Sequence, residues 1–250
     1  MARRRFFVDR IHHQQAELTG EDAHHLTRVL RVEKNQRYEL SDNHSVYLGE
    51  VMEARKDRVL FQILEQLPLN PLPVRLTLVT ALVKFDRLEW ILEKGTELGV
   101  EQFVLFQAER SEKGLDRGAE KRLHRWKRIL LEASQQCRRD RLPELALAPS
   151  FQAAAGNAVH PRYVLDESGG PPLLSALPDH PEPGGTAALM IGPEGGWTDR
   201  EREVCAAGGW APVSQGPNIL RAETAAISAV AILGAAWLAA QRTSNVSVAQ

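Results

Sequence analysis

The sequence predicts a two-part α/β protein, with a small β-rich domain over residues 1–70 and a larger domain over residues 71–250 built on a parallel sheet. Three observations support this arrangement. Strand-like segments dominate the first part, a proline-rich stretch separates the parts, and strand-like and helix-like segments alternate through the second. Such alternation is typical of parallel strands with helices on both faces of the sheet.

The domain boundary is set by the segment Leu67–Pro73, which contains three prolines. Proline removes a backbone donor and fixes φ, so this stretch predicts a short, stiff linker. One helix is expected before it, from Thr19 to Leu30, because Thr19 and Asp22 have the spacing of a capping box. The strands expected before the linker are 37–40, 45–51 and 59–64, the first two forming a hairpin.

In the larger domain, apolar runs indicate strands and apolar residues at helical spacing indicate helices. The expected strands end near Val83 or cover residues 103–106, 162–165, 187–191 and 212–215. Helices are expected from Asp86, in the basic stretch around Trp126, from Thr198 and from Arg221. Asp86 and Thr198 are each followed three residues later by glutamate, which is the capping-box spacing.

Composition excludes several classes of protein. The chain has 250 residues, of which 43% are hydrophobic and 25% charged, and these values are those of a globular protein. A net charge of -1 gives no overall reason to expect nucleic acid, although Arg117–Arg141 is strongly basic and suits either a phosphate-binding face or a solvated helix. Cys137 and Cys205 are too few for a disulfide framework, which favours the cytoplasm. The apolar run Ala225–Ala240 is shorter than the roughly 20 residues of a membrane span and predicts a buried helix.

The common nucleotide and metal motifs are missing from the sequence. Neither the phosphate loop of nucleoside triphosphatases nor the glycine fingerprint of dinucleotide-binding folds occurs. His12-His13 and His24-His25 are adjacent pairs whose side chains point in different directions, so we expect no metal site. The sequence therefore predicts neither a phosphate cradle nor a bound metal.

A first candidate site is Ile191-Gly192-Pro193-Glu194-Gly195-Gly196-Trp197, directly after the most apolar predicted strand. Ligands of open parallel sheets bind at the carboxyl ends of strands. Glycines there permit positive φ and let a ligand approach the main chain. A plain connecting turn is the alternative, but three glycines, a proline and a carboxylate exceed what a turn needs, so we favour a site.

A second candidate site is the segment 215–225, Gln-Gly-Pro-Asn-Ile-Leu-Arg-Ala-Glu-Thr-Ala, between a short strand and a helix. Ile219 and Leu220 would form an apolar cradle for an aromatic ring, with Arg221 and Glu223 supplying charge at the helix start. The alternative is that Ile219 and Leu220 fill the core and Glu223 complements the helix dipole. Taken alone, the segment does not decide between these interpretations.

Three segments together resemble one known family: Gly-Pro-Glu-Gly-Gly at 192–196, Gly-Pro-Asn-Ile-Leu-Arg-Ala-Glu-Thr-Ala at 216–225, and Glu-Lys-Gly-Thr-Glu-Leu-Gly at 93–99. This is the RsmE family, ribosomal RNA small-subunit methyltransferases of the SPOUT superfamily that methylate N3 of a uridine in 16S-type rRNA. Residues 4–7 and 24–31 are similar to the family's PUA-like RNA-binding domain, and residues 132–137 also fit the family. The resemblance covers nearly the whole chain.

The resemblance implies S-adenosylmethionine as cofactor, a C-terminal trefoil knot, a cytoplasmic homodimer, and 16S rRNA or the small ribosomal subunit as partner. This cofactor has no phosphate, which agrees with the missing phosphate motifs. The implied cofactor-binding residues are Ile191, Gly192, Gly195, Gly196, Gln215, Gly216, Pro217, Ile219 and Leu220.

The catalytic residues expected are Arg221, to stabilise negative charge on the base or to hold a phosphate nearby, and Glu223, to accept a proton or to orient Arg221. RNA affinity should come from cations that contact phosphates. The residues expected to do so are Arg3, Arg4, Arg5, Arg28, Arg31, Lys84, Arg138 and Arg139.

The sequence departs from the family pattern before the Ile-Leu-Arg motif, where the usual Leu-Gly-x-Arg is replaced by Gln215-Gly216-Pro217-Asn218. Arg138 replaces a usual glycine, and Val83-Lys84-Phe85 replaces a Pro-Lys-Gly-type segment. Two alternatives therefore remain open. The chain would be an RNA-binding module of the same fold without methyl transfer, or an α/β enzyme acting on a small molecule.

Overall fold

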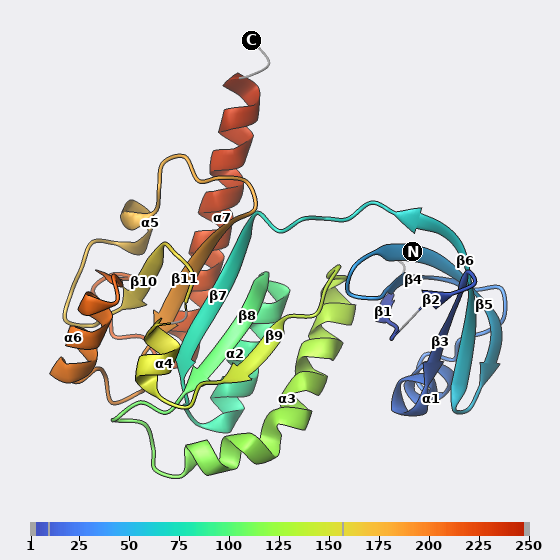
Figure 1. Cartoon of the computed structure of the whole chain (residues 1–250), viewed down its shortest axis with the longest axis horizontal. Coiled ribbons are helices and arrows are strands. Elements are labelled where there is room, and N and C mark those ends of the chain that lie inside the picture. Colours follow the sequence, from blue (N-terminus) through green and yellow to red (C-terminus); the bar gives the residue numbers. More distant parts are fainter. Residues whose placement is uncertain (1–3, 10, 157, 248–250) are drawn as a thin grey trace. The chain divides into compact units, whose positions relative to one another are not determined.

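The computed structural model describes residues 4–9, 11–156 and 158–247 (Figure 1). The chain divides into two compact units, one of residues 1–71 with 131–142 and one of residues 72–130 with 143–250. The expected boundary between residues 70 and 71 lies one residue before the division along the chain. The inclusion of residues 131–142 in the first unit has no counterpart in the sequence pattern.

The described part of the first unit is a six-stranded mixed sheet with helix α1 (Gly20–Arg28) and the last turns of α3 (Leu115–Cys137). Its strands are β1 (Arg5–Phe7), β2 (Ile11–His12), β3 (Gln15–Thr19), β4 (Arg37–Ser41), β5 (Val46–Arg55) and β6 (Arg58–Leu67). They lie in the order β1-β4-β5-β6-β3-β2, with β1 parallel to β4 and the other neighbours antiparallel. The predicted hairpin is confirmed as β4 and β5, and Phe6, Leu26, Leu40 and Phe61 belong to its buried core.

Hydrogen bonds join residues 131–142 to the rest of the first unit. The Asp140 carboxylate pairs with the guanidinium of Arg5, and its backbone carbonyl accepts from the Ser41 hydroxyl at 2.5 Å. The backbone N–H of Leu142 donates to the Asn43 side chain at 2.9 Å. These contacts are between residues about a hundred positions apart in sequence, so local sequence patterns could not predict them.

The second unit is a six-stranded parallel sheet with the strand order β12-β10-β11-β7-β8-β9. Its strands are β7 (Val74–Ala81), β8 (Val100–Phe106), β9 (Glu144–Leu147), β10 (Arg162–Leu165), β11 (Gly185–Ile191) and β12 (Ala211–Val213). Its helices are α2 (Phe85–Glu97), α3 (Leu115–Cys137, which ends in the first unit), α4 (Phe151–Gly156), α5 (Leu173–Ala176), α6 (Asp199–Ala207) and α7 (Ala222–Ser247).

Helices cover both faces of this sheet, as predicted, because its strands are apolar on both sides (Figure 1). In β11, Leu189 belongs to a core shared with α2, α3 and α7, whereas the next residue, Met190, belongs to a core shared with α4 and α6. The carboxyl end of β11 lies between the ends of two neighbouring strands, which places the loop after it near the centre of that edge.

Three capping boxes were predicted from the sequence, and the structure shows which of them form. The box at Thr198 is confirmed, because the Thr198 hydroxyl accepts from the backbone of Glu201 and the Glu201 carboxylate accepts from the backbone of Thr198. The box at Thr19 is wrong, since its side chain makes no cap bond before α1. The box at Asp86 is also wrong, because α2 begins one residue earlier and Lys84 takes the cap position.

Helix α7 is longer and less buried than its sequence predicts. Its inner face packs Ala226, Val230, Leu233 and Trp237 into the core. Its stretch Ala222–Gln241 is long and apolar enough to cross a membrane by length and composition, and only 33% of the most apolar window is buried. Core helices of soluble proteins meet the same criterion. The expectation of a buried helix is therefore corrected to a helix with one buried face and one exposed apolar face.

Candidate active site

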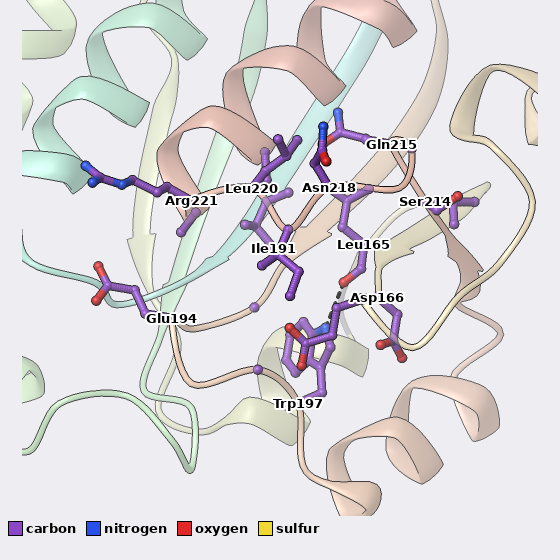
Figure 2. A pocket seen from close by; sticks show the side chains of 18 of the residues that line it. Leu165, Asp166, Ile191, Glu194, Trp197, Ser214, Gln215, Asn218, Leu220 and Arg221 are labelled. Carbon is purple, nitrogen blue, oxygen red and sulfur yellow. Dashed lines mark hydrogen bonds between the residues drawn. The ribbon is translucent and has the colours of Figure 1, made fainter.

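A cavity of about 530 Å³ opens at the carboxyl ends of β10, β11 and β12 (Figure 2). Both segments singled out in the sequence line it, and residues after β10 together with Arg87 of α2 complete the wall. Of the predicted cofactor-binding residues, the wall includes Ile191, Gly192, Gly196, Gln215, Gly216, Pro217, Ile219 and Leu220. Gly195 is not part of it, because this glycine packs against Arg110, whose guanidinium donates to its carbonyl oxygen at 3.2 Å.

The glycine-rich loop after β11 is held by Trp197. Its indole Nε1 donates to the Leu165 carbonyl oxygen at 2.8 Å, which ties this loop to the end of β10 (Figure 2). The indole is buried against Phe106 and Phe151. A Cβ on Gly192 would lie 2.8 Å from an atom of this ring, so the close approach requires glycine at 192.

The second loop is fixed to α7 by the side chain of Gln215. With its amide oriented to satisfy every donor and acceptor, its oxygen accepts from Ala229 N at 2.8 Å and its nitrogen donates to Ala225 O at 3.2 Å. The side chain of Gln215 is therefore bonded within the protein, and the residue lines the cavity with the rest of the loop. The departure of Gln215 from the family pattern thus has a structural role.

The two apolar residues of the second loop do not fill the core. Ile219 is 85% exposed and Leu220 is half-buried, and both line the cavity. This excludes the alternative in which both serve only as core residues. An exposed isoleucine on a cavity wall is an apolar surface that a bound ring would cover.

One side of the cavity carries side chains of both charges. In Figure 2, Arg221 and Glu194 are on the side opposite Ser214 and Asp166, with Ile191 and Leu165 between. Arg221 is exposed, and no ion pair of its guanidinium is found among the described residues. Its charge is therefore available to a ligand.

Glu223 lies behind this charged side rather than on the cavity wall. Its Oε1 is 3.9 Å from Nε of Arg87, and its Oε2 is buried with no hydrogen-bond partner in the described part of the chain. No contact of Glu223 with Arg221 is found there. The cation found beside Glu223 is therefore Arg87 and not Arg221. The sequence analysis missed Arg87 because nothing local links α2 to loops a hundred residues later.

The opposite side of the cavity is acidic and well ordered. Asp166 binds Arg202 through two hydrogen bonds, of 2.8 and 3.1 Å. Burial by itself would raise the pKa of Asp166, but hydrogen bonds from Arg202 and from Ser168 outweigh it, so the pKa is lowered from its ordinary value. Asp166 is therefore a structural carboxylate that orders the segment after β10.

The cations expected to contact RNA fall into two groups. Arg4, Arg28, Arg31, Lys84 and Arg138 are exposed. Arg5 and Arg139 are buried, and Arg5 binds Glu39, Asp140 and the Arg138 carbonyl oxygen, so neither is available to a phosphate in this structure. A buried guanidinium keeps its ion-pair partners because a buried charge without a partner costs several kcal/mol, on the order of 3–5. Arg3 lies outside the described residues.

The cavity fits S-adenosylmethionine. Its aliphatic wall of Leu165, Ile191 and Leu220 suits an adenine ring, and the glycine-rich loop offers main-chain groups at close range. No group of three or more histidine, cysteine or acidic residues able to hold a metal occurs among the described residues.

Two families match the chain by sequence. Residues 70–234 match the family described as RNA methyltransferase domain, and residues 18–64 match the family described as RNA methyltransferase PUA domain. The chain is 32% identical to Ribosomal RNA small subunit methyltransferase E of Bacillus subtilis over 243 residues, 92% of this chain and 95% of that protein. It is 34% identical to the protein of the same name from Synechocystis over 226 residues, 87% of this chain and 72% of that one.

Two solved structures are similar over nearly the whole chain. The Ribosomal RNA small subunit methyltransferase E from Neisseria gonorrhoeae, bound to S-adenosyl methionine, has a TM-score of 0.84 and 28% identity and covers 94% of this chain and 98% of that one. A methyltransferase from Legionella pneumophila, in complex with the bound cofactor SAM, has a TM-score of 0.85 and 29% identity, with the same coverage.

Proposed function

The chain belongs to the family of RNA methyltransferases that includes Ribosomal RNA small subunit methyltransferase E, and we propose that it methylates N3 of a uridine in 16S rRNA with S-adenosylmethionine as donor. The observation that carries the proposal is the single cavity formed by the two loops 191–197 and 213–222. Aliphatic walls, glycines and an unpaired arginine suit a nucleoside cofactor without phosphate beside an electron-rich base.

The proposed cofactor-binding residues are those of the two loops that line the cavity, with Ile219 and Leu220 against the adenine and Gly192 and Gly196 leaving room at the main chain. S-adenosylmethionine, when bound, supplies a methyl group activated by a sulfonium. The chain itself holds two reactants in place, and alignment of this kind is worth up to about 7–11 kcal/mol of the barrier in favourable cases.

The proposed catalytic residue is Arg221. Removal of the N3 proton leaves negative charge on the uracil ring, and an exposed guanidinium at the cavity stabilises such charge. Glu223 is proposed as a positioning residue that acts through Arg87, because its carboxylate faces Arg87 and does not line the cavity.

RNA contacts are proposed for exposed cations of each unit by itself. Arg4, Arg28, Arg31 and Arg138 would contact phosphates from the β-rich unit and Lys84 from the parallel-sheet unit. The match of residues 18–64 to a PUA domain supports this assignment.

A trefoil knot in the C-terminal region is also proposed. The family membership supports it, as do the bonds around β12: Ser214 N donates to Pro171 O at 3.0 Å and Leu173 N donates to Ser214 O at 2.8 Å. These bonds pair the segment after β10 side by side and in parallel with the chain that leads into α7.

A cytoplasmic homodimer is the proposed state of the protein. The exposed apolar face of α7, with Ala235, Leu238 and Ala239, and Trp90 on the neighbouring α2 support an interface with a second copy. Small residues at helical spacing let two backbones approach closely.

The proposed function is tested by incubating the protein with methyl-labelled S-adenosylmethionine and small ribosomal subunits from cells that lack this methylation. A methyl group on N3 blocks the Watson–Crick edge, so reverse transcription should stop at one uridine of 16S rRNA. Free 16S rRNA in a parallel reaction identifies the preferred substrate. Cofactor and RNA binding without any label transfer would favour a non-catalytic RNA-binding module instead.

A further inference from the structure

We propose that Arg87 and Glu194 together recognise the imide edge of the target uridine, with Arg87 donating to a ring carbonyl and Glu194 accepting from N3–H. The inference deepens the proposed function and rests on it, because it names the residues that select the base. The sequence analysis placed Glu194 in the first candidate site without giving it a role, and it did not identify Arg87.

The pair is built from two distant segments that meet at the cavity. Arg87 is in the first turn of α2, Glu194 is in the glycine-rich loop after β11, and both line the same cavity. Their side chains form an ion pair, with 26% of Arg87 and 41% of Glu194 still exposed. A donor and an acceptor thus stand next to each other on an accessible wall.

A third residue holds Arg87 in this position. Glu223 Oε1 lies 3.9 Å from Arg87 Nε, and the Glu223 side chain is only 14% exposed. A guanidinium has five N–H donors in a fixed plane, so it can face two carboxylates and still offer an N–H to a ligand. Glu223 therefore positions Arg87 from behind, and Glu194 lies with Arg87 on the cavity side.

The hydrogen-bonding pattern of this pair suits uridine and not cytidine. The imide edge of uridine reads acceptor, donor, acceptor across O2, N3–H and O4, whereas N3 of cytidine is an acceptor next to a donor amine. A carboxylate facing N3 attracts the uridine N–H and repels the cytidine lone pair. Sites that hydrogen-bond a specific group discriminate strongly, because a mismatched ligand leaves buried polar groups unpaired.

The same contact places a proton acceptor where the reaction needs one. The N3–H bond breaks, the proton passes to a carboxylate oxygen of Glu194, and the electron pair stays on N3. Arg221 lies on the same side of the cavity as Glu194 (Figure 2), and Arg87 is paired with Glu194, so both cations would stabilise the negative charge that develops on the ring oxygens.

The test measures base selection without turnover. The protein, loaded with the non-reactive product S-adenosylhomocysteine, is titrated with the rRNA fragment that carries the mapped uridine, or with cytidine or 3-deazauridine at that position. The wild-type protein should bind the uridine fragment about tenfold or more tightly than either analogue. Arg87→Gln and Glu194→Gln should reduce this preference to less than about threefold, and Arg87→Lys should keep part of it.

Matched controls are Arg75→Gln and Glu93→Gln, an arginine and a glutamate of the same unit that do not line the cavity. Both should keep the wild-type preference. The proposal is overturned if either site variant keeps the full preference for uridine, or if it loses affinity for S-adenosylhomocysteine, since the pair would then serve the cofactor. Failure of the wild-type protein to methylate rRNA is a separate result that would refute the proposed function itself.

Discussion

The indole Nε1 of Trp197 donates a 2.8 Å hydrogen bond to the carbonyl oxygen of Leu165, joining the loop after β11 to the end of β10. This bond spans two neighbouring parallel strands at the edge of the sheet where the cavity opens. It shapes one wall of the cavity through a residue that is itself almost fully buried.

Trp197→Phe should keep the aromatic packing but leave the Leu165 carbonyl without its donor. We expect a loss of about 1–2 kcal/mol in the free energy of unfolding, measured by denaturant titration, and weaker binding of S-adenosylmethionine by calorimetry. Trp210→Phe is the control, because Trp210 Nε1 makes a comparable 3.0 Å bond to Ala155 O away from the cavity. Trp210→Phe should lower the free energy of unfolding without changing cofactor affinity. Equal losses of cofactor affinity in both variants would contradict the role of Trp197 in shaping the cavity wall.

Gly192→Ala should disturb the cavity wall at Trp197, because the added methyl group would press against the indole ring. Its Cβ would lie 2.8 Å from the Trp197 ring, and overpacking of this kind costs about 1–3 kcal/mol. Gly192→Ala should therefore lower both the free energy of unfolding and the affinity for the cofactor. At Gly156 a new Cβ would meet nothing within 4 Å, so Gly156→Ala should change neither quantity. Unchanged cofactor binding in Gly192→Ala would show that the loop does not need this close approach.

Ile219→Ser tests the apolar wall. Because Ile219 is 85% exposed, the substitution should change the free energy of unfolding by less than about 0.5 kcal/mol. It should weaken S-adenosylmethionine binding by about tenfold, the effect of losing one apolar side chain from a ligand contact. Leu174→Ser, at a side chain 64% exposed and outside the cavity, should leave affinity unchanged. A strongly destabilised Ile219→Ser would instead indicate a core role.

The double variant Arg28→Gln and Arg31→Gln tests the RNA surface. Both cations are exposed at the end of α1 and just after it. Each lost phosphate contact should reduce the slope of log K against log salt concentration by about 0.7–0.9, so the pair should lower it by roughly 1.5. Arg55→Gln removes an exposed cation already paired with Glu53 and should barely change the slope. An unchanged slope in the double variant would exclude these residues from the interface.

The lowered pKa of Asp166 predicts that the stability of the protein depends on pH. Its folded-state pKa is lowered from the ordinary 3.8, so its contribution to stability is present above about that pH and is lost as the pH falls through the folded value. Asp166→Asn removes this contribution, and the difference in unfolding free energy from the wild type should shrink as the pH falls below 3.8. Asp199→Asn, which affects an exposed partner of the same Arg202, should show little difference at any pH. A constant difference for Asp166→Asn would contradict the assignment.

Elements marked by strong local signals were predicted well. Strand β10 has the predicted residues 162–165, and the capping box at Thr198 forms as the local spacing of threonine and glutamate predicts. Short or nonlocal elements were missed. Strand β9 is only four residues long, Glu144–Leu147, which is too short for a clear pattern, and Thr19 fails as a cap although its spacing is suitable.

The same distinction holds for the site. The two loops could be predicted as site segments because glycine-rich and apolar segments after strands are unusual in sequence. Arg87 was not visible, because its importance comes from Glu194 and Glu223, more than a hundred residues away in sequence. The burial of Arg5 likewise depends on Asp140, a partner that only the folded chain brings near.

The central claim is that two C-terminal loops form one site for a nucleoside cofactor that carries no phosphate. Isothermal titration of the intact protein with S-adenosylmethionine, and with ATP at the same concentration, tests it most directly. We expect S-adenosylmethionine to bind with a dissociation constant on the order of 10 μM and ATP to show no heat of binding. Tight binding of ATP, or no binding of S-adenosylmethionine, would contradict the claim.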